Sequence, residues 1–152
     1  IVFGDWSSDV CSSDLVTKEI VEKLIKSELN PEIFPFIEAL ARRDKKSALK
    51  ILKEYQEVGQ SDQYLVSMIG YQLKTMIIIK DLLEKNTMPG SIAKIAGINP
   101  YVINKNISLV RQYSITDLIK MYEKLIKSDA SIKSGRLDSK TALFLLVAKL
   151  SG

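Results

Sequence analysis

From Val16 onward, the apolar residues recur mostly at the spacing of an α-helix. Between Ser61 and Lys85 they cover more than half of a helix circumference: Leu65, Met68, Ile69, Leu73, Met76, Ile77, Leu82 and Leu83. After Ser114 they form a single stripe with helical spacing: Ile115, Leu118, Ile119, Tyr122, Leu125 and Ile126. No long segment alternates apolar and polar residues as a half-buried strand would. The pattern predicts an all-α protein in which several neighbours bury the helix after Ser61.

Capping residues, together with glycine and proline, set the boundaries of the predicted helices. Helices are expected at about 17–29, 34–43, 45–58, 61–85, 91–96, 100–110, 114–132 and 138–150. Met88-Pro89-Gly90 predicts a turn, and Gly97 predicts a helix end with positive φ. Ser114 and Asp117 have the spacing of a capping box. Because the connections are short, we expect a bundle of about five to seven helices that pack antiparallel.

The first fifteen residues differ in composition from the rest of the chain. They contain no Lys or Arg, and they hold the chain's one Trp and one Cys, Trp6 and Cys11. Residues 5–15 resemble the translation of a widely used short-read sequencing adapter. We therefore interpret residues 1–15 as a non-native tail and expect it to pack poorly, with Trp6 and Cys11 exposed. The alternative is a native, Ser/Asp-rich flexible N-terminus.

The composition excludes several kinds of chemistry. The chain has 152 residues, of which 46% are hydrophobic and 26% charged, as in one globular domain. It has no His, which excludes His-based catalytic triads and His-containing zinc sites. The one Cys can form no internal disulfide, so a reduced, intracellular setting is expected. No uncharged run is long enough for a membrane-spanning helix, and no membrane partner is expected.

No motif for catalysis or cofactor binding stands out. Phosphate-binding motifs of the G-x-x-x-x-G-K-[ST] and G-x-G-x-x-G types do not occur. Acidic residues are scattered singly along the predicted helices, and Ser and Thr mostly stand at helix caps. We therefore predict no catalytic, cofactor-binding or metal-binding residue and no cofactor, and an enzyme is the least favoured class of function.

Setting residues 1–15 aside changes the balance of charge. Three Asp residues leave with them, so the rest of the chain has 22 basic and 15 acidic residues, a net charge of +7. The densest basic run is 42–46, with Asp44 at its centre. This run is either a solvated loop partly paired with Asp44 or a docking and phosphate-contact surface.

Residues 91–103 resemble a helix-turn-helix DNA reader. Such a motif places small and apolar residues where this segment has Ala93, Gly97, Ile98 and Ile103. Any short helix, glycine and second helix in a bundle needs the same residue types. Pro100 and Tyr101 stand where polar, base-contacting side chains would be expected. A stand-alone helix-turn-helix DNA-binding domain is therefore the alternative interpretation.

A longer, ordered set of motifs runs through the chain. In order they are Ile33-Phe34-x-Phe36-Ile-Glu-Ala39-Leu40, Arg43-Asp44 with Ala48-Leu49, Gln72-Leu73-Lys74, Ile92-Ala93-x-x-x-Gly97-Ile98-x-Pro100-Tyr101-Val102-x-x-Lys105, Tyr113-Ser114-x-x-x-Leu118 and Asp129-x-x-x-Lys133-x-Gly135. With these spacings, residues 30–150 resemble the C-terminal region of bacterial DNA polymerase III delta subunits. In that family, delta is the clamp-loader subunit that binds and opens the sliding clamp.

The resemblance implies a division of the chain and a role for it. Residues 30–152 would be a helical collar domain, and 16–29 the last helix of a preceding AAA+-like region. The chain would be a C-terminal fragment, without the AAA+-like and clamp-binding domains. It would be a non-catalytic part of a DNA-directed DNA polymerase holoenzyme, in the bacterial cytoplasm at the nucleoid-associated replisome.

The resemblance also implies partners. The collar domain would pack with the same domain of the gamma/tau and delta-prime subunits, and the missing N-terminal domains would bind the clamp. The net charge of +7 still permits weak, non-specific contact with DNA backbone. Candidate residues for subunit contacts are Tyr71, Gln72, Lys74, Tyr101, Lys105, Arg111 and Lys133.

Burial should separate the collar domain from the DNA reader. A DNA reader should expose Lys94, Asn104 and Lys105 on a protruding helix. A collar domain should instead bury Ala93 and Gly97 in the bundle.

Overall fold

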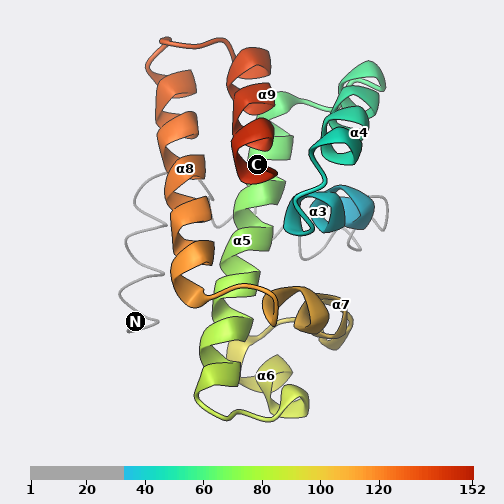
Figure 1. Ribbon diagram of the computed structural model, residues 1–152, viewed down its shortest axis with the longest axis vertical. Coiled ribbons are helices and arrows are strands. Elements are labelled where there is room, and N and C mark those ends of the chain that lie inside the picture. Colours follow the sequence, from blue (N-terminus) through green and yellow to red (C-terminus); the bar gives the residue numbers. More distant parts are fainter. Residues whose placement is uncertain (1–32) are drawn as a thin grey trace.

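The computed structural model describes residues 33–152, which form helices and connecting loops without a strand (Figure 1). The seven helices are α3 (Ile33–Ala41), α4 (Lys45–Glu57), α5 (Asp62–Glu84), α6 (Pro89–Ala96), α7 (Pro100–Val110), α8 (Ile115–Lys133) and α9 (Ser139–Leu150). The all-α class and the helical bundle expected from the sequence are thereby confirmed. The tail at 1–15 and the helix expected at 17–29 lie outside the described residues.

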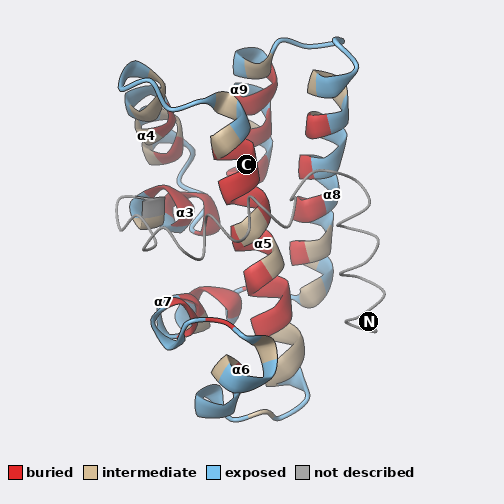
Figure 2. Cartoon of the chain, turned by 180° about the vertical axis from the view of Figure 1, so that it is seen from behind, coloured by how far each residue is buried: buried red, intermediate tan, exposed pale blue. Residues whose placement is uncertain are grey.

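Helix α5 is the centre of the bundle. It contacts α6, α7, α8 and α9, and most of its residues from Leu65 to Ile79 are buried. Figure 2 shows this buried stretch along α5 and buried residues on the neighbouring helices. In Figure 1, α8 runs antiparallel to α5, and α9 runs antiparallel to α8. The expectation that several neighbours bury this helix is confirmed.

The apolar stripes of α8 and α9 pack against α5. Leu118 and Leu125 of α8 and Leu143 of α9 are fully buried. Burying each such side chain stabilises the fold by about 1.5–3 kcal/mol relative to leaving it in water. Ile126, at the edge of the predicted stripe of α8, is 36% exposed, because that side of the helix turns away from α5.

Short polar side chains begin the helices as the sequence indicates. Asp44, Ser61 and Asp138 each accept a hydrogen bond from the backbone N–H three residues later, at 3.1, 3.2 and 3.0 Å. Asn99 begins α7 in a similar way and accepts from the second N–H after it at 2.9 Å. Each cap satisfies a donor that the first turn of a helix leaves without a partner.

The turn predicted at Met88–Gly90 is wrong, because α6 begins there. Pro89 is the first residue of α6, and Met88 precedes it in extended backbone. A proline costs nothing at that position, since its missing N–H would have had no partner in the helix. At the other end of α6, Gly97 has a φ of 64°, which confirms the predicted left-handed helix end.

Two buried polar contacts hold α3 and α7 in place. The Tyr113 hydroxyl, between α7 and α8, donates to the carbonyl of Ala41 at the end of α3. On α5, the Gln72 side-chain amide donates to Oδ1 of Asn106 on α7. Asn106 in turn donates to the carbonyl of Val102 at 2.8 Å. These bonds satisfy polar groups that would otherwise be costly to bury.

Candidate subunit-interaction surfaces

The seven candidate contact residues do not form one surface. Three of them lie in the middle of α5: Tyr71, Gln72 and Lys74. Tyr101 and Lys105 lie on α7, and Arg111 lies at its end. Lys133 lies at the end of α8. Figure 1 shows α7 near the lower end of the molecule and the end of α8 at the upper end. The structure therefore brings Tyr101 and Lys105 of α7 together, and we call these two residues the α7 group. It separates them from Lys133.

The α7 group presents an exposed aromatic side chain. Tyr101 is 50% exposed, and its ring meets that of Phe34 edge to face at a centroid distance of 5.8 Å. Nζ of Lys105 lies 5.8 Å from the centroid of the same ring. A cation at this distance is attracted to the negative face of the ring. Tyr101 is thus held by two neighbours and still has half of its surface free for a partner.

Gln72 does not reach the surface. It is 6% exposed and bonded to Asn106, so its side chain belongs to the core; its selection as a subunit contact is a wrong prediction for this fold. Tyr71 and Lys74, on the same helix, are half-buried. Burial raises the pKa of the Tyr71 phenol, while a side-chain hydrogen bond with Thr75 acts in the opposite direction. The phenol therefore stays protonated at neutral pH.

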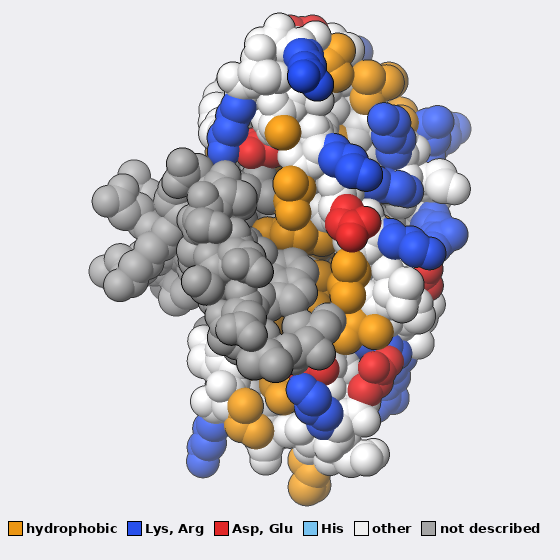
Figure 3. Space-filling view, turned by 90° about the vertical axis from the view of Figure 1, so that its left-hand side faces the viewer, with side chains coloured by type: hydrophobic (Ala, Val, Ile, Leu, Met, Phe, Trp, Pro, Cys, Tyr) orange, Lys and Arg blue, Asp and Glu red, His pale blue; other side chains and the backbone are white. Residues whose placement is uncertain are grey.

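Lys133 forms an ion pair within its own helix. Its Nζ lies 2.9 Å from Oδ2 of Asp129, which is 4% exposed. The other carboxylate oxygen, Oδ1, has no hydrogen-bond partner among the described residues. Because a buried carboxylate needs a nearby cation, the first role of Lys133 is inside this domain. Figure 3 shows further basic side chains gathered toward the same end of the molecule, on the face that carries α8.

The basic run 42–46 is largely occupied by local contacts. Arg42 pairs with Glu38 at 2.5 Å, and Asp44 caps α4 instead of pairing with the basic residues beside it. The Arg43 guanidinium lies 5.8 Å from the centroid of the Tyr113 ring. These contacts favour the solvated, partly paired loop over the docking surface.

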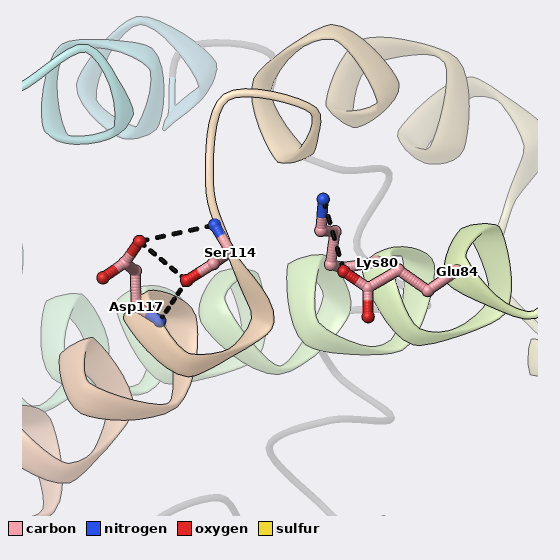
Figure 4. Close-up of polar contacts among 4 residues, drawn as sticks. All are labelled: Lys80, Glu84, Ser114 and Asp117. Atoms are coloured by element: carbon pink, nitrogen blue, oxygen red, sulfur yellow. Dashed lines mark hydrogen bonds and ion pairs between the residues drawn. The ribbon is translucent and has the colours of Figure 1, made fainter.

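Figure 4 shows the start of α8 and a stretch of α5 near it. The backbone N–H of Asp117 donates to Oγ of Ser114 at 3.1 Å, and the N–H of Ser114 donates to the Asp117 carboxylate at 3.4 Å. This is the predicted capping box, and its hydrogen bonds from Ser114 lower the pKa of Asp117. On α5, Lys80 and Glu84 form an ion pair at 3.5 Å. These polar groups are satisfied within the domain.

Burial in the α6–α7 region does not separate the collar domain from the DNA reader. Lys94, Asn104 and Lys105 are exposed, as expected for a DNA reader and equally for a solvated helix face. The expectation that a collar domain buries Gly97 is wrong, because Gly97 is exposed at the end of α6, and Ala93 is half-buried. Gly97 is needed for its backbone angle rather than for close packing, since an added Cβ would meet nothing within 4 Å.

Two large apolar side chains on the outer side of α9 are exposed, which the pattern of apolar residues did not predict. Phe144 is 51% exposed and Leu145 39%, whereas the buried apolar residues of α9 are Ala142, Leu143, Leu146, Val147 and Leu150. The signal was present in the sequence, because apolar residues occur on nearly all sides of this helix. Which side lacks a neighbour could be known only from the fold.

The described part of the chain has neither a membrane-spanning helix nor a cluster of metal-ligating side chains. No helix of residues 33–152 has the length and apolar content needed to cross a bilayer. In the same range, Asp, Glu, Cys and His side chains do not gather in groups of three or more that could hold a metal ion.

Comparison with known proteins identifies the family. No curated protein sequence matches the chain. A solved structure, the DNA clamp loader delta protein of Bacillus subtilis, is similar with a TM-score of 0.74 at 19% identity, which shows a shared fold. The match covers 86% of this chain and 39% of that protein, so the chain spans well under half of its length. The family model for the C-terminal domain of the DNA polymerase III delta subunit matches residues 30–150, and the chain therefore belongs to that family.

Proposed function

We propose that residues 30–152 are the collar domain of a clamp-loader delta subunit. In the intact protein this domain packs with the equivalent helical domains of the gamma/tau and delta-prime subunits, while the sliding clamp is bound by N-terminal domains. The role is non-catalytic, and its place is the bacterial cytoplasm, at the replisome on the nucleoid. The observation that carries the proposal is the family match over residues 30–150.

The surface of the described domain supports an assembly role. Large apolar side chains are exposed at several places, including Ile95 at 62% and Tyr101 at 50%. Aromatic side chains are enriched where proteins contact one another. The proposed contact residues are Tyr71, Lys74, Tyr101, Lys105 and Arg111. Lys133 pairs with Asp129 inside the domain, and only the exposed part of its side chain can contact another subunit.

The test is assembly with the proposed partners. The chain is mixed with purified gamma/tau and delta-prime subunits, and the mass of the product is measured by light scattering after gel filtration. We expect a complex that contains all the subunits. Tyr101→Ala should weaken it, because the exposed ring is lost, whereas Gln112→Ala, a matched change at an exposed position past the end of α7, should not.

One result would overturn the proposal. If the chain stays strictly monomeric with these subunits and protects a defined DNA sequence at physiological salt, it is a helix-turn-helix DNA reader. A chain that binds DNA weakly and without sequence preference, yet assembles, is the collar domain.

A further inference from the structure

A groove of about 140 Å³ runs between α8 and α9. Its apolar part comes from Leu137, Leu145 and Leu146, and its basic part from Lys124, Lys127 and Lys149. All three lysines are exposed, and Leu137 and Leu145 are 37% and 39% exposed. The groove therefore offers apolar surface and positive charge side by side.

The outer side of α9, beside this groove, carries further exposed apolar surface. Phe144, next to Leu145 in the chain, is 51% exposed. Ala148, one helical turn after Phe144, is half-buried. A helix with apolar residues on nearly all sides is normally covered on each of them. In the described part of the chain, α4, α5 and α8 contact α9 and leave this outer side open.

The lysines of the groove lack the ion pairs that occur on other helices. On α3, α4, α5 and the end of α8, basic side chains pair with carboxylates one turn away. Lys124, Lys127 and Lys149 have no carboxylate within 4 Å among the described residues. Nζ of Lys124 instead lies 3.4 Å from the carbonyl of Lys149. Their charge is therefore available to an acidic partner.

We infer that this groove receives an amphipathic helix with an acidic border from a neighbouring clamp-loader subunit. The apolar stripe of that helix covers Leu137, Leu145 and Phe144, and its Asp and Glu side chains face the three lysines. The inference rests on the proposed function and adds to it which face is used and what chemistry the partner has. A subunit that packs between two different neighbours needs two different patches, and the groove supplies one that is separate from the α7 group.

The mixed chemistry favours a protein helix over nucleic acid. A DNA backbone would satisfy the lysines but would leave the leucines and Phe144 in contact with water. An amphipathic helix satisfies both, since helix-in-groove recognition uses an apolar stripe flanked by charges.

The first experiment reverses the charge of the groove. Lys124→Glu, Lys127→Glu and Lys149→Glu are combined in the full chain, and a second variant carries Phe144→Ser with Leu145→Ser. Binding to gamma/tau and delta-prime is measured as a dissociation constant, and circular dichroism checks that each variant is folded. We expect each variant to bind at least about tenfold more weakly than the parent chain. Lys94→Glu, an exposed lysine on α6, is the matched control and should change binding less than about twofold.

The second experiment needs no partner subunit. A fluorescent 18-residue helical peptide of Leu, Ala and Glu is compared with one in which Lys replaces Glu. The acidic peptide should bind the parent chain and lose at least about tenfold in affinity for the charge-reversed variant, while the basic peptide should not bind. Equal binding of both peptides, or no loss in the variant, overturns the inference.

The outcomes separate this inference from the proposed function. If the parent chain assembles and both groove variants assemble equally well, the groove inference fails and the collar proposal stands. If the parent chain fails to assemble although the acidic peptide binds the groove, the collar proposal fails. If charge reversal abolishes DNA binding and leaves assembly intact, the groove is a nucleic-acid surface and the inference is wrong.

Discussion

Two glycines of the α6 region differ in backbone conformation and in little else. Gly97 ends α6 with a φ of 64°, whereas Gly90 is the second residue of the same helix. An added Cβ would meet nothing within 4 Å at either position. Any difference between them on substitution must therefore come from the backbone. In the left-handed region a side chain costs about 1–2 kcal/mol, whereas within a helix Ala is favoured over Gly by up to about 1 kcal/mol.

The same substitution should thus have opposite effects at these two sites. Gly97→Ala should lower the melting temperature by about 3–8 °C, and Gly97→Val by more, because a β-branched residue fits the left-handed region worse. Gly90→Ala should leave the melting temperature unchanged or raise it slightly. Thermal unfolding followed by circular dichroism measures both. An unchanged melting temperature for Gly97→Val would contradict the assigned role of Gly97.

The buried carboxylate of Asp129 should make Lys133 important for stability. Lys133→Met leaves Asp129 without its cation at a site where the Asp129 side chain is 5% exposed. Since Lys133 is itself 41% exposed and water screens the pair, we expect a loss of about 1–2 kcal/mol in the free energy of unfolding. Lys127→Met, an exposed lysine of the same helix without an ion pair, should change it by less than about 0.5 kcal/mol.

A double-mutant cycle checks this assignment by urea unfolding. When Asp129→Asn is added to Lys133→Met, part of the lost stability should return, because the uncompensated charge is gone. Strictly additive effects of the two substitutions would mean that the pair contributes nothing.

At the scale of the helices, three carboxylates at helix starts tie stability to pH. Side-chain hydrogen bonds from Ser47, Ser114 and Thr141 lower the pKa of Asp44, Asp117 and Asp138, respectively. A carboxyl whose pKa is lower in the folded chain favours folding when it is ionised. Its contribution is fully present above about pH 4 and is lost as the pH falls through its lowered value.

Replacing two of these carboxyls should reduce the sensitivity to acid. Asn caps a helix about as well as Asp does but does not titrate, so Asp44→Asn with Asp138→Asn should keep nearly the parent melting temperature at pH 7. Between pH 5 and pH 2.5 the variant should lose less stability than the parent chain does. Melting temperatures across this range provide the measurement, and parallel curves for the two chains would refute the assignment.

Helix positions were predictable because their signals are local. The caps at Asp44, Ser61 and Asp138 and the glycine end at Gly97 each depend on a few neighbouring residues. The same local signals misled at Pro89, because a Pro-Gly pair is typical of a turn and equally compatible with the first turn of a helix. In the fold, α6 packs against α5 and α7, and the Pro-Gly pair itself carries no sign of these contacts.

The candidate contact residues were less predictable, because exposure depends on partners distant in the chain. Gln72 is a polar helix residue that the sequence presents as a surface group, and its burial depends on Asn106, 34 residues away. The outward side of α9 was missed for the related reason that its apolar residues look like core until the neighbours of the helix are known. The sequence predicted the fold and the family, and the structure determined which faces are open.

At the scale of the whole molecule, charge should govern any contact with DNA. Residues 16–152 carry a net charge of +7, and the basic side chains of the described part are spread over several helices, so one duplex can reach only a few of them. With about three phosphate contacts, the logarithm of the binding constant should fall with the logarithm of the salt concentration with a slope of about −3. Affinity should therefore drop roughly 50-fold between 50 and 200 mM salt.

Such binding should also be indifferent to sequence and should compete with assembly. Phosphate contacts carry no sequence information, so two unrelated duplexes of equal length should bind the chain alike. If the α8–α9 groove holds a subunit, its lysines are no longer free, and the assembled chain should show a shallower salt slope than the isolated chain. Fluorescence anisotropy with two duplexes, measured at several salt concentrations with and without partner subunits, gives both quantities. A preference above tenfold for one duplex, or affinity that does not respond to salt, would contradict a role limited to backbone contact.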